Sequence, residues 1–218
     1  MPPHRDGRGE VAKIVLEAAQ KILPPGPPRL TAELLLASLA DAAGLALGRI
    51  SLLDRLADAA TTDPLTRLPD RRALLEAAPR TIAQARRDAR PITMAMLDID
   101  RFKRINDLFG HTEGDHVLRE VALPIRSGLR AGDLVARWGG EEFAAILAGC
   151  TPEQARDRLD RLRMATNDID WAGTHAGVSF SAGVTQIQDG ETLETTLERA
   201  DAVLYQAKAA GRGRSEIA

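Results

Sequence analysis

The segment at residues 134–147 reads LVARWGGEEFAAIL, in which two apolar runs are joined by the pair Gly139-Gly140. A Gly-Gly pair supplies the positive φ angles of a tight primed turn, so the pattern predicts a β-hairpin with strands at about 134–138 and 142–147. Asn, Asp or Lys would suit such a tip better than two adjacent glutamates, Glu141 and Glu142. The glutamates therefore indicate a purpose other than turning the chain.

The elements around this hairpin are predicted from periodicity. Helices are expected at about 71–87, 114–130, 151–165 and 193–211, and further strands at 92–98 and 178–187. The order β-α-β-β-α-β predicts an α/β (α+β) fold of the ferredoxin-like palm type, with a central, mostly antiparallel sheet flanked by helices.

The first 61 residues form a separate helical extension in this interpretation. The sequence PPGPP at 24–28 separates a helix at about 11–23 from a long helix at about 31–61, which Asp63-Pro64 ends. Two apolar stripes with heptad spacing compete on the long helix, Leu45-Leu52-Ala59 and Leu39-Ala46-Leu53-Ala60. A helix packed on its own domain and a parallel dimer stalk both remain open. The expected domains are residues 1–61, resembling the end of a sensor module, and residues 62–218.

Composition restricts the class of protein. The chain of 218 residues is 44% hydrophobic and 28% charged, as in soluble globular proteins, and its net charge of −2 gives no reason to expect nucleic-acid binding. The most apolar stretch, 30–50, is interrupted by charges, so no membrane span is expected. The single cysteine, Cys150, allows no internal disulfide and suits a cytoplasmic location.

Acidic residues end one predicted strand and begin another. Asp98 and Asp100 close the buried run at 92–98, where an ionised carboxylate is costly unless it is compensated. If that strand neighbours the hairpin, Asp98 and a glutamate converge, and carboxylate oxygens are the ligands that Mg²⁺ prefers. The simpler alternative is that the strand has ended and both aspartates are solvated.

Several motifs, taken together, resemble the GGDEF family of diguanylate cyclases in its GGEEF form. The resemblance covers about 63–218. The matching segments are DPLTRL (63–68), DIDRFKRIND (98–107) with FGH (109–111) and GD (114–115), RWGGEEF (137–143), SAGV (181–184), and AD (200–201) through YQAK (205–208) to GR (211–212).

This resemblance implies an enzyme that condenses two GTP into cyclic di-GMP, with Mg²⁺ or Mn²⁺ as cofactor. The implied catalytic set comprises Glu142, Glu141 and Lys103. Glu142 would serve as a further metal contact or as the base for the ribose 3′-hydroxyl. The implied metal ligands are Asp98, Glu141, Glu142 and the carbonyl of Ile99. The implied substrate-binding residues are Asn106 and Asp115 at the guanine edge, His111, the segment Arg101, Phe102 and Lys103, and the cations Lys208 and Arg212.

The resemblance also implies regulation and assembly. Arg130 and Asp133 match the family's inhibitory product site, which Arg161 would complete; the alternative is a surface ion pair. Each half-site holds one GTP, so a homodimer through the N-terminal helices is expected. Two alternatives are a catalytically silent domain that binds GTP or cyclic di-GMP, and an adenylyl cyclase or polymerase palm. The intact signature argues against the first and the guanine-reading pair against the second.

Overall fold

The structure is a computed structural model, and it describes residues 38, 42–46, 61–174 and 177–218. The chain divides into two units, Met1–Ala60 and Thr61–Ala218, which are described separately. In the first unit residues 42–46 are helical. Most of the predicted N-terminal helices and of both apolar stripes lies outside the described residues, so the stalk stays a prediction.

The second unit is a five-stranded sheet with the strand order β2-β3-β1-β4-β5. Strand β1 is central and antiparallel to both β3 and β4, β2 pairs antiparallel with β3, and the short β5 runs parallel to β4. The elements are α3 (Arg71–Arg87), β1 (Ile92–Ile99), α4 (Phe102–Phe109), α5 (His111–Gly128), β2 (Leu134–Arg137), β3 (Glu142–Ala148), α6 (Pro152–Thr166), β4 (Phe180–Gln186), α7 (Leu193–Ala209) and β5 (Ser215–Ile217).

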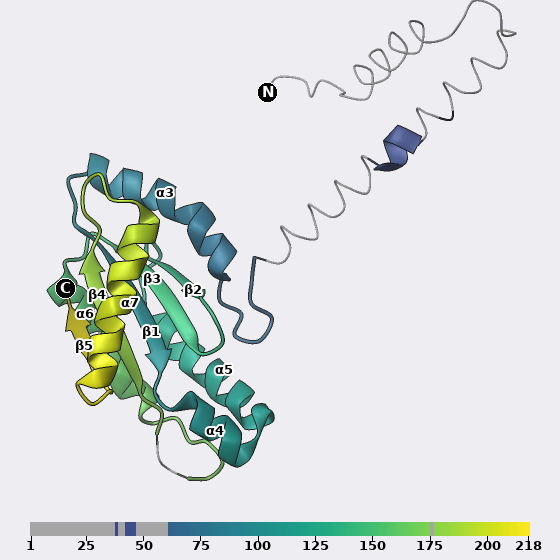
Figure 1. The fold of residues 1–218 in the computed structure, drawn as a ribbon, viewed down its shortest axis with the longest axis vertical. Coiled ribbons are helices and arrows are strands. Elements are labelled where there is room, and N and C mark those ends of the chain that lie inside the picture. Colours follow the sequence, from purple (N-terminus) through teal and green to yellow (C-terminus); the bar gives the residue numbers. More distant parts are fainter. Residues whose placement is uncertain (1–37, 39–41, 47–60, 175–176) are drawn as a thin grey trace, which may run out of the picture. The chain divides into compact units, whose positions relative to one another are not determined.

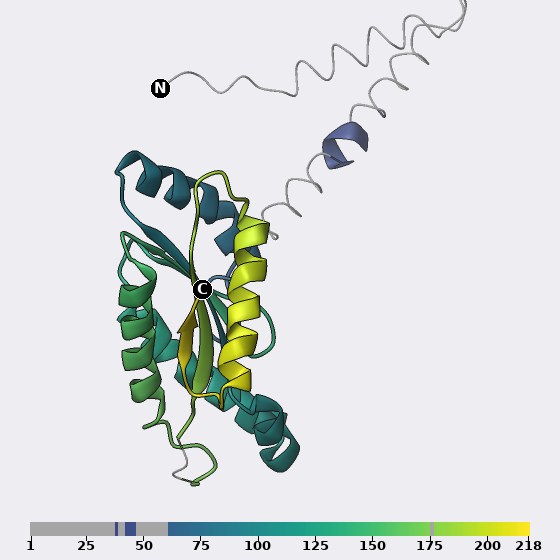
Figure 2. The ribbon, with the colours of Figure 1, turned by 60° about the vertical axis from the view of Figure 1, so that its left-hand side comes forward.

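Helices cover both faces of the sheet, which explains why every residue of β1 is buried. Figure 2 shows the sheet between α6 on one side and α7 on the other. On one face, residues such as Leu97 and Phe143 form a core with α4, α5 and α6. On the other, Met94, Met96 and Ile146 form a second core with α3 and α7. Because side chains alternate along a strand, each residue of β1 is assigned to one of these two faces.

The predicted fold class is confirmed: the sheet is mostly antiparallel, flanked by helices and ordered as in a ferredoxin-like palm (Figure 1). Two elements were not predicted. Helix α4 spans only eight residues, too few for a clear apolar period, and Gly110, with φ 82°, separates it from α5. Strand β5 has three residues and follows the glycine-rich turn after α7.

The predicted conformation of the Gly139-Gly140 pair was wrong. Neither glycine has φ in the left-handed region, so the turn is not of the primed type. A Cβ at Gly139 would come within 2.8 Å of Glu142 Oε2, the movable end of that side chain, so a larger residue here would displace the carboxylate. Trp138 N closes the turn by donating to the Glu142 carbonyl at 2.8 Å.

Candidate active site at the end of strand β1

Two carboxylates lie opposite each other on one face of the sheet. Asp98 in β1 pairs in register with Glu142 in β3. By strand alternation both share the face of Met96 and Ala144, which is the face covered by α3 and α7. The structure thus brings together Asp98 and Glu142, as the strand pattern predicts.

Helix α7 brings a lysine to this pair. The Lys208 Nζ lies 2.8 Å from the Asp98 Oδ2, and the two side chains are 30% and 12% exposed. The helix packs close to the sheet because Gly183 in β4 has no side chain: a Cβ there would overlap the backbone of Ala200 and Leu204. The glycine of the SAGV motif therefore determines how near Lys208 approaches the carboxylates.

The electrostatics of the pair favour a cation. Burial raises the pKa of Asp98 above its ordinary value, although hydrogen bonding and attraction from Lys208 oppose the shift. Burial also raises the pKa of Glu142, and repulsion from Asp98 adds to it. A divalent cation between the carboxylates would relieve both costs, and this all-oxygen donor set suits Mg²⁺, which takes one or two carboxylates plus substrate phosphates. In the described part of the chain no three His, Cys, Asp or Glu side chains form a group that could hold a metal ion by themselves.

The neighbouring acidic residues differ in position. Glu141 lies in the turn, half-buried, and its carbonyl accepts a hydrogen bond from Ile99 N at 3.2 Å, which fixes the turn against the end of β1. Asp100 accepts from Ser181 Oγ at 2.6 Å and from Gly213 N at 2.9 Å. Asp100 therefore ties β1 to β4 and to the loop after α7.

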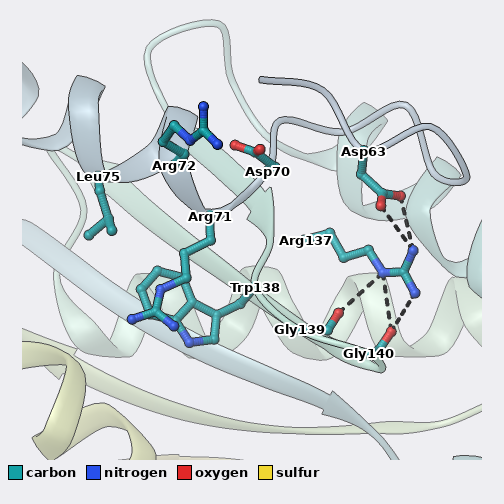
Figure 3. A pocket seen from close by; sticks show the side chains of 9 residues that line it. All are labelled: Asp63, Asp70, Arg71, Arg72, Leu75, Arg137, Trp138, Gly139 and Gly140. Carbon is teal, nitrogen blue, oxygen red and sulfur yellow. Dashed lines mark hydrogen bonds and ion pairs between the residues drawn. The ribbon is translucent and has the colours of Figure 1, made fainter. Parts of the chain in front are cut away.

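An ion pair holds the signature turn from outside. The Arg137 Nη1 contacts both Asp63 carboxylate oxygens, at 3.1 and 3.0 Å, and its Nη2 donates to the Gly140 carbonyl at 2.7 Å (Figure 3). Burial alone would raise the pKa of Asp63, but hydrogen bonds from Thr66 and from Arg137 outweigh burial and lower it. Sequence reasoning found both segments but missed their contact, which only the tertiary fold creates.

The same turn borders a cavity of about 590 Å³. In Figure 3 the Arg71 side chain lies along the indole of Trp138, and its guanidinium carbon is 4.3 Å from the ring centroid. This cation–π contact packs the start of α3 against the hairpin. The turn that carries the glutamates is thus braced by two arginines, Arg71 and Arg137.

The predicted nucleotide-binding residues lie on α4 and α5, at the end of β1 (Figure 1). Asn106 is half-buried, and its side chain lies over Gly114, where any Cβ would overlap the amide oxygen. Asp115 follows at the next position of α5 and is exposed. Arg101 and Lys103 are exposed at the start of α4, and Phe102 between them is buried. His111 is exposed at the start of α5, and Arg212 is exposed in the turn after α7.

The predicted product site has one partner that sequence reasoning missed. Asp133 accepts hydrogen bonds from Arg130 N at 2.8 Å and from Arg158 Nη1 at 2.6 Å, and its side chain is 1% exposed. The Arg130 side chain is exposed, as is Arg161 one turn further along α6. Arg158 lies one helical turn before Arg161 on α6, and only Arg161 was assigned to this site from the sequence.

The sheet thus has a ferredoxin-like strand order and carries two apposed carboxylates at the end of its central strand. The chain belongs to the GGDEF-domain family: the family described as "Diguanylate cyclase, GGDEF domain" matches residues 60–214.

Similar proteins include diguanylate cyclases and a response regulator. Diguanylate cyclase DgcP of Pseudomonas aeruginosa is 46% identical over 161 residues, which are 73% of this chain and 24% of that protein. Response regulator PleD of Caulobacter vibrioides is 40% identical over 165 residues, 73% of this chain and 36% of that protein. The chain thus spans only about a quarter to a third of these relatives.

Solved structures agree with this family. The GGDEF domain of DgcB from Caulobacter crescentus, in complex with c-di-GMP, has a TM-score of 0.68 and 36% identity over 72% of this chain and 95% of that one. Diguanylate cyclase SiaD of Pseudomonas aeruginosa, in complex with its activator SiaC, has a TM-score of 0.69 and 36% identity over 98% of this chain and 81% of that one. Within the described residues, no helix has the length and apolar character needed to cross a membrane.

Proposed function

We propose that this chain is a diguanylate cyclase that condenses two GTP into cyclic di-GMP and releases two pyrophosphates. The observation that carries the proposal is the apposition of Asp98 and Glu142 beside Lys208, in a chain that belongs to the GGDEF family. The single cysteine is consistent with the cytoplasm as the proposed location.

The chain's own residues would supply binding and proton transfer. Asp98, Glu141, Glu142 and the Ile99 carbonyl are the proposed holders of Mg²⁺ or Mn²⁺. When bound, such an ion spreads the charge of the triphosphate and favours attack on phosphorus. The ribose 3′-oxygen of one GTP forms a bond to the α-phosphorus of the other, and the bond to pyrophosphate breaks. Glu142, which lies opposite Asp98 across the strand pair, is the proposed acceptor of the 3′-hydroxyl proton.

Substrate recognition is assigned to α4, α5 and α7. Asp115 would accept hydrogen bonds from the guanine N1–H and N2–H groups, and the Asn106 amide would serve the adjacent acceptor and donor. Adenine lacks that donor arrangement, so a site built for guanine would reject it. Lys208, Lys103 and the Arg101–Lys103 amides are proposed for the phosphates, with Arg212 and His111 as further contacts.

Two such reactions must occur between two GTP molecules, so two copies of the domain would face each other with their sites apposed. The proposed dimer contacts are the N-terminal helices. Cyclic di-GMP is the proposed feedback ligand at Arg130 and Asp133, with Arg161 from a second copy. Support comes from Arg158, which fixes Asp133 and leaves the Arg130 guanidinium free to reach a ligand.

The test is incubation of the purified protein with GTP and Mg²⁺, followed by chromatography for cyclic di-GMP and pyrophosphate. We expect two pyrophosphates per cyclic product, none with ATP, and none from the Glu142→Gln variant. Glu198→Gln, an exposed change on α7, is the matched control and should keep full activity. Binding of GTP without product from the unaltered protein would refute a cyclase and support the alternative, a silent nucleotide-binding module.

A further inference from the structure

Two aspartates at the end of strand β1 have different partners. Asp98 faces Lys208, whose Nζ lies 2.8 Å from its Oδ2, and belongs to the candidate active site. Asp100 follows two residues later and is half-buried. Among the described residues it forms no ion pair, and both of its carboxylate oxygens accept hydrogen bonds instead. The proposed chemistry leaves this second carboxylate without a role.

The two oxygens of Asp100 connect two different segments. Oδ1 accepts from the hydroxyl of Ser181, which is fully buried in β4 directly opposite Asp98. Oδ2 accepts from the backbone N–H of Gly213. Hydrogen bonds to a charged acceptor are stronger than those between neutral groups. Asp100 is therefore oriented by the sheet and holds the turn at 210–214, which joins α7 to β5.

The turn that Asp100 holds has an unusual backbone. Gly211, Arg212 and Gly213 are consecutive and have φ angles of 115°, 66° and 60°. Glycine adopts such angles freely, whereas in an arginine they cost free energy and persist where the surrounding structure imposes them. Here the hydrogen bond from Gly213 N to Asp100 and the one from Arg212 N to the Ala207 carbonyl, at 3.1 Å, impose them.

The geometry of this turn decides where the Arg212 side chain lies. Within the described segments its guanidinium makes no ion pair and no hydrogen bond, so only its own backbone anchors it. Burial raises the pKa of Asp98, and the charges of Lys208 and Arg212 oppose that rise, so Arg212 is within electrostatic reach of the carboxylate. Arg212 thus lies beside the active site because of the turn, and not because of contacts of its side chain.

We propose that Asp100 is a positioning residue for GTP binding, which holds the turn at 210–214 so that the Arg212 guanidinium meets the triphosphate. This inference rests on the proposed function, in which Arg212 contacts the substrate. Because both oxygens of Asp100 are occupied by Ser181 and Gly213, Asp100 itself touches neither the nucleotide nor the metal ion. Its contribution to GTP affinity therefore passes through Arg212.

Binding of 3′-deoxy-GTP tests this role without turnover. The analogue lacks the hydroxyl that would attack a second nucleotide, so it is not consumed. Its affinity is measured by titration calorimetry in the presence of Mg²⁺, for the native chain, Asp100→Ala, Arg212→Ala and the double variant. Asp168→Ala, an exposed change in the loop after α6, is the matched control and should bind as the native chain does.

We expect Asp100→Ala and Arg212→Ala each to weaken binding roughly tenfold, and the double variant to bind no more weakly than the weaker single variant. Asp100→Ala and Asn106→Ala should instead act independently, because Asn106 belongs to the guanine side of the site. Unchanged affinity in Asp100→Ala, or independent effects of Asp100 and Arg212, would overturn the proposal. Equal coupling of Asp100 to Asn106 and to Arg212 would also overturn it, by showing that the whole site was disturbed.

Asp100→Asn separates the hydrogen bonds from the charge. Its amide oxygen can accept from Gly213 N while its amide nitrogen donates to Ser181 Oγ, so its affinity should stay within about twofold of the native value. Binding as weak as that of Asp100→Ala would contradict a role based on these hydrogen bonds. If circular dichroism shows that Asp100→Ala does not fold, Asp100→Ser takes its place, since serine is too short to reach both partners.

The outcomes separate the two proposals. A native chain that binds no 3′-deoxy-GTP would overturn the GTP site, and with it the proposed function. A chain that binds the analogue, but in which Asp100 and Arg212 act independently, would overturn the positioning role alone.

Discussion

Replacing Asp63 with asparagine isolates the ion pair that holds the signature turn. The change keeps the shape of the side chain but removes the charge facing Arg137, whose other donors remain on the Gly139 and Gly140 carbonyls. The two side chains are 16% and 17% exposed, so solvent screens the pair only partly. The turn loses one of its anchors, while the amide oxygen can still accept the hydrogen bonds that Asp63 receives from Thr66 N and Oγ.

The magnitude follows from these contacts. Removing one partner of a fully buried pair costs about 3–5 kcal/mol, whereas exposed pairs are worth about 0–1 kcal/mol. Breaking a pair at this depth, with the asparagine amide oxygen retained as an acceptor, should lower the unfolding free energy by about 1–3 kcal/mol. For a domain of this size that corresponds to a fall in Tm of roughly 2–4 °C per kcal/mol.

The pH dependence gives a sharper signature. The folded-state pKa of Asp63 lies below the ordinary value of an aspartate, so its ionised form stabilises the fold at pH values above that ordinary pKa. This contribution is lost as the pH falls through the lowered folded-state pKa. The difference in unfolding free energy between the native chain and Asp63→Asn should therefore be full at neutral pH and shrink in acid.

The assay is urea unfolding monitored by circular dichroism at a series of pH values. Asp168→Asn, an exposed change in the loop after α6, is the matched control and should show no comparable loss. We also expect slower GTP turnover in Asp63→Asn, because the turn positions Glu142. An unchanged unfolding free energy at neutral pH, or a difference that grows in acid, would refute this reasoning.

Three further predictions concern the sheet, the lysine and the product turn. Gly183→Ala places a Cβ against the backbone of α7 and should lower the unfolding free energy by about 1–3 kcal/mol, so an unchanged melting temperature would contradict the close packing of that helix. In metal-free protein, Lys208→Met should raise the pKa of Asp98 further, because the carboxylate stays buried and loses the attraction of the lysine. If NMR of the carboxyl group finds the same or a lower pKa, the ion pair between Lys208 and Asp98 is disproved. Arg158→Ala leaves the Asp133 carboxylate buried without its guanidinium partner and should cost about 2–4 kcal/mol in denaturant unfolding, whereas a loss under 1 kcal/mol would show that the pair is not structural.

The sheet was predictable because its strands have local signals. The run at 92–98 is apolar throughout and lies on the buried central strand, and the helix at 71–87 was placed at its observed bounds. The helix expected at about 151–165 was found at Pro152–Thr166, where Thr151 is the N-cap and forms a capping box with Gln154. Helix α4 and strand β5 were missed because both are too short to show a period. Helix α4 depends on packing against α5, and strand β5 depends on pairing with β4.

Within the candidate site, the sequence indicated which residues carry charge but not which of them meet. The apposition of Asp98 and Glu142 follows from the order and register of β1 and β3, which could be stated from the sequence only as a condition. The contacts Lys208–Asp98 and Arg137–Asp63 join segments far apart in the chain, and no local pattern specifies them. The Gly139 conformation was wrongly predicted because the turn closes without a positive φ at either glycine.

The most direct test of the apposed carboxylates is Mn²⁺ binding, measured by electron paramagnetic resonance with a non-hydrolysable GTP analogue present. The account predicts that the native chain takes up Mn²⁺ together with the analogue, and that Asp98→Asn binds the ion roughly tenfold more weakly or worse, because it loses a charged ligand. Equal Mn²⁺ affinity in the two proteins would contradict a cation site built on Asp98 and Glu142.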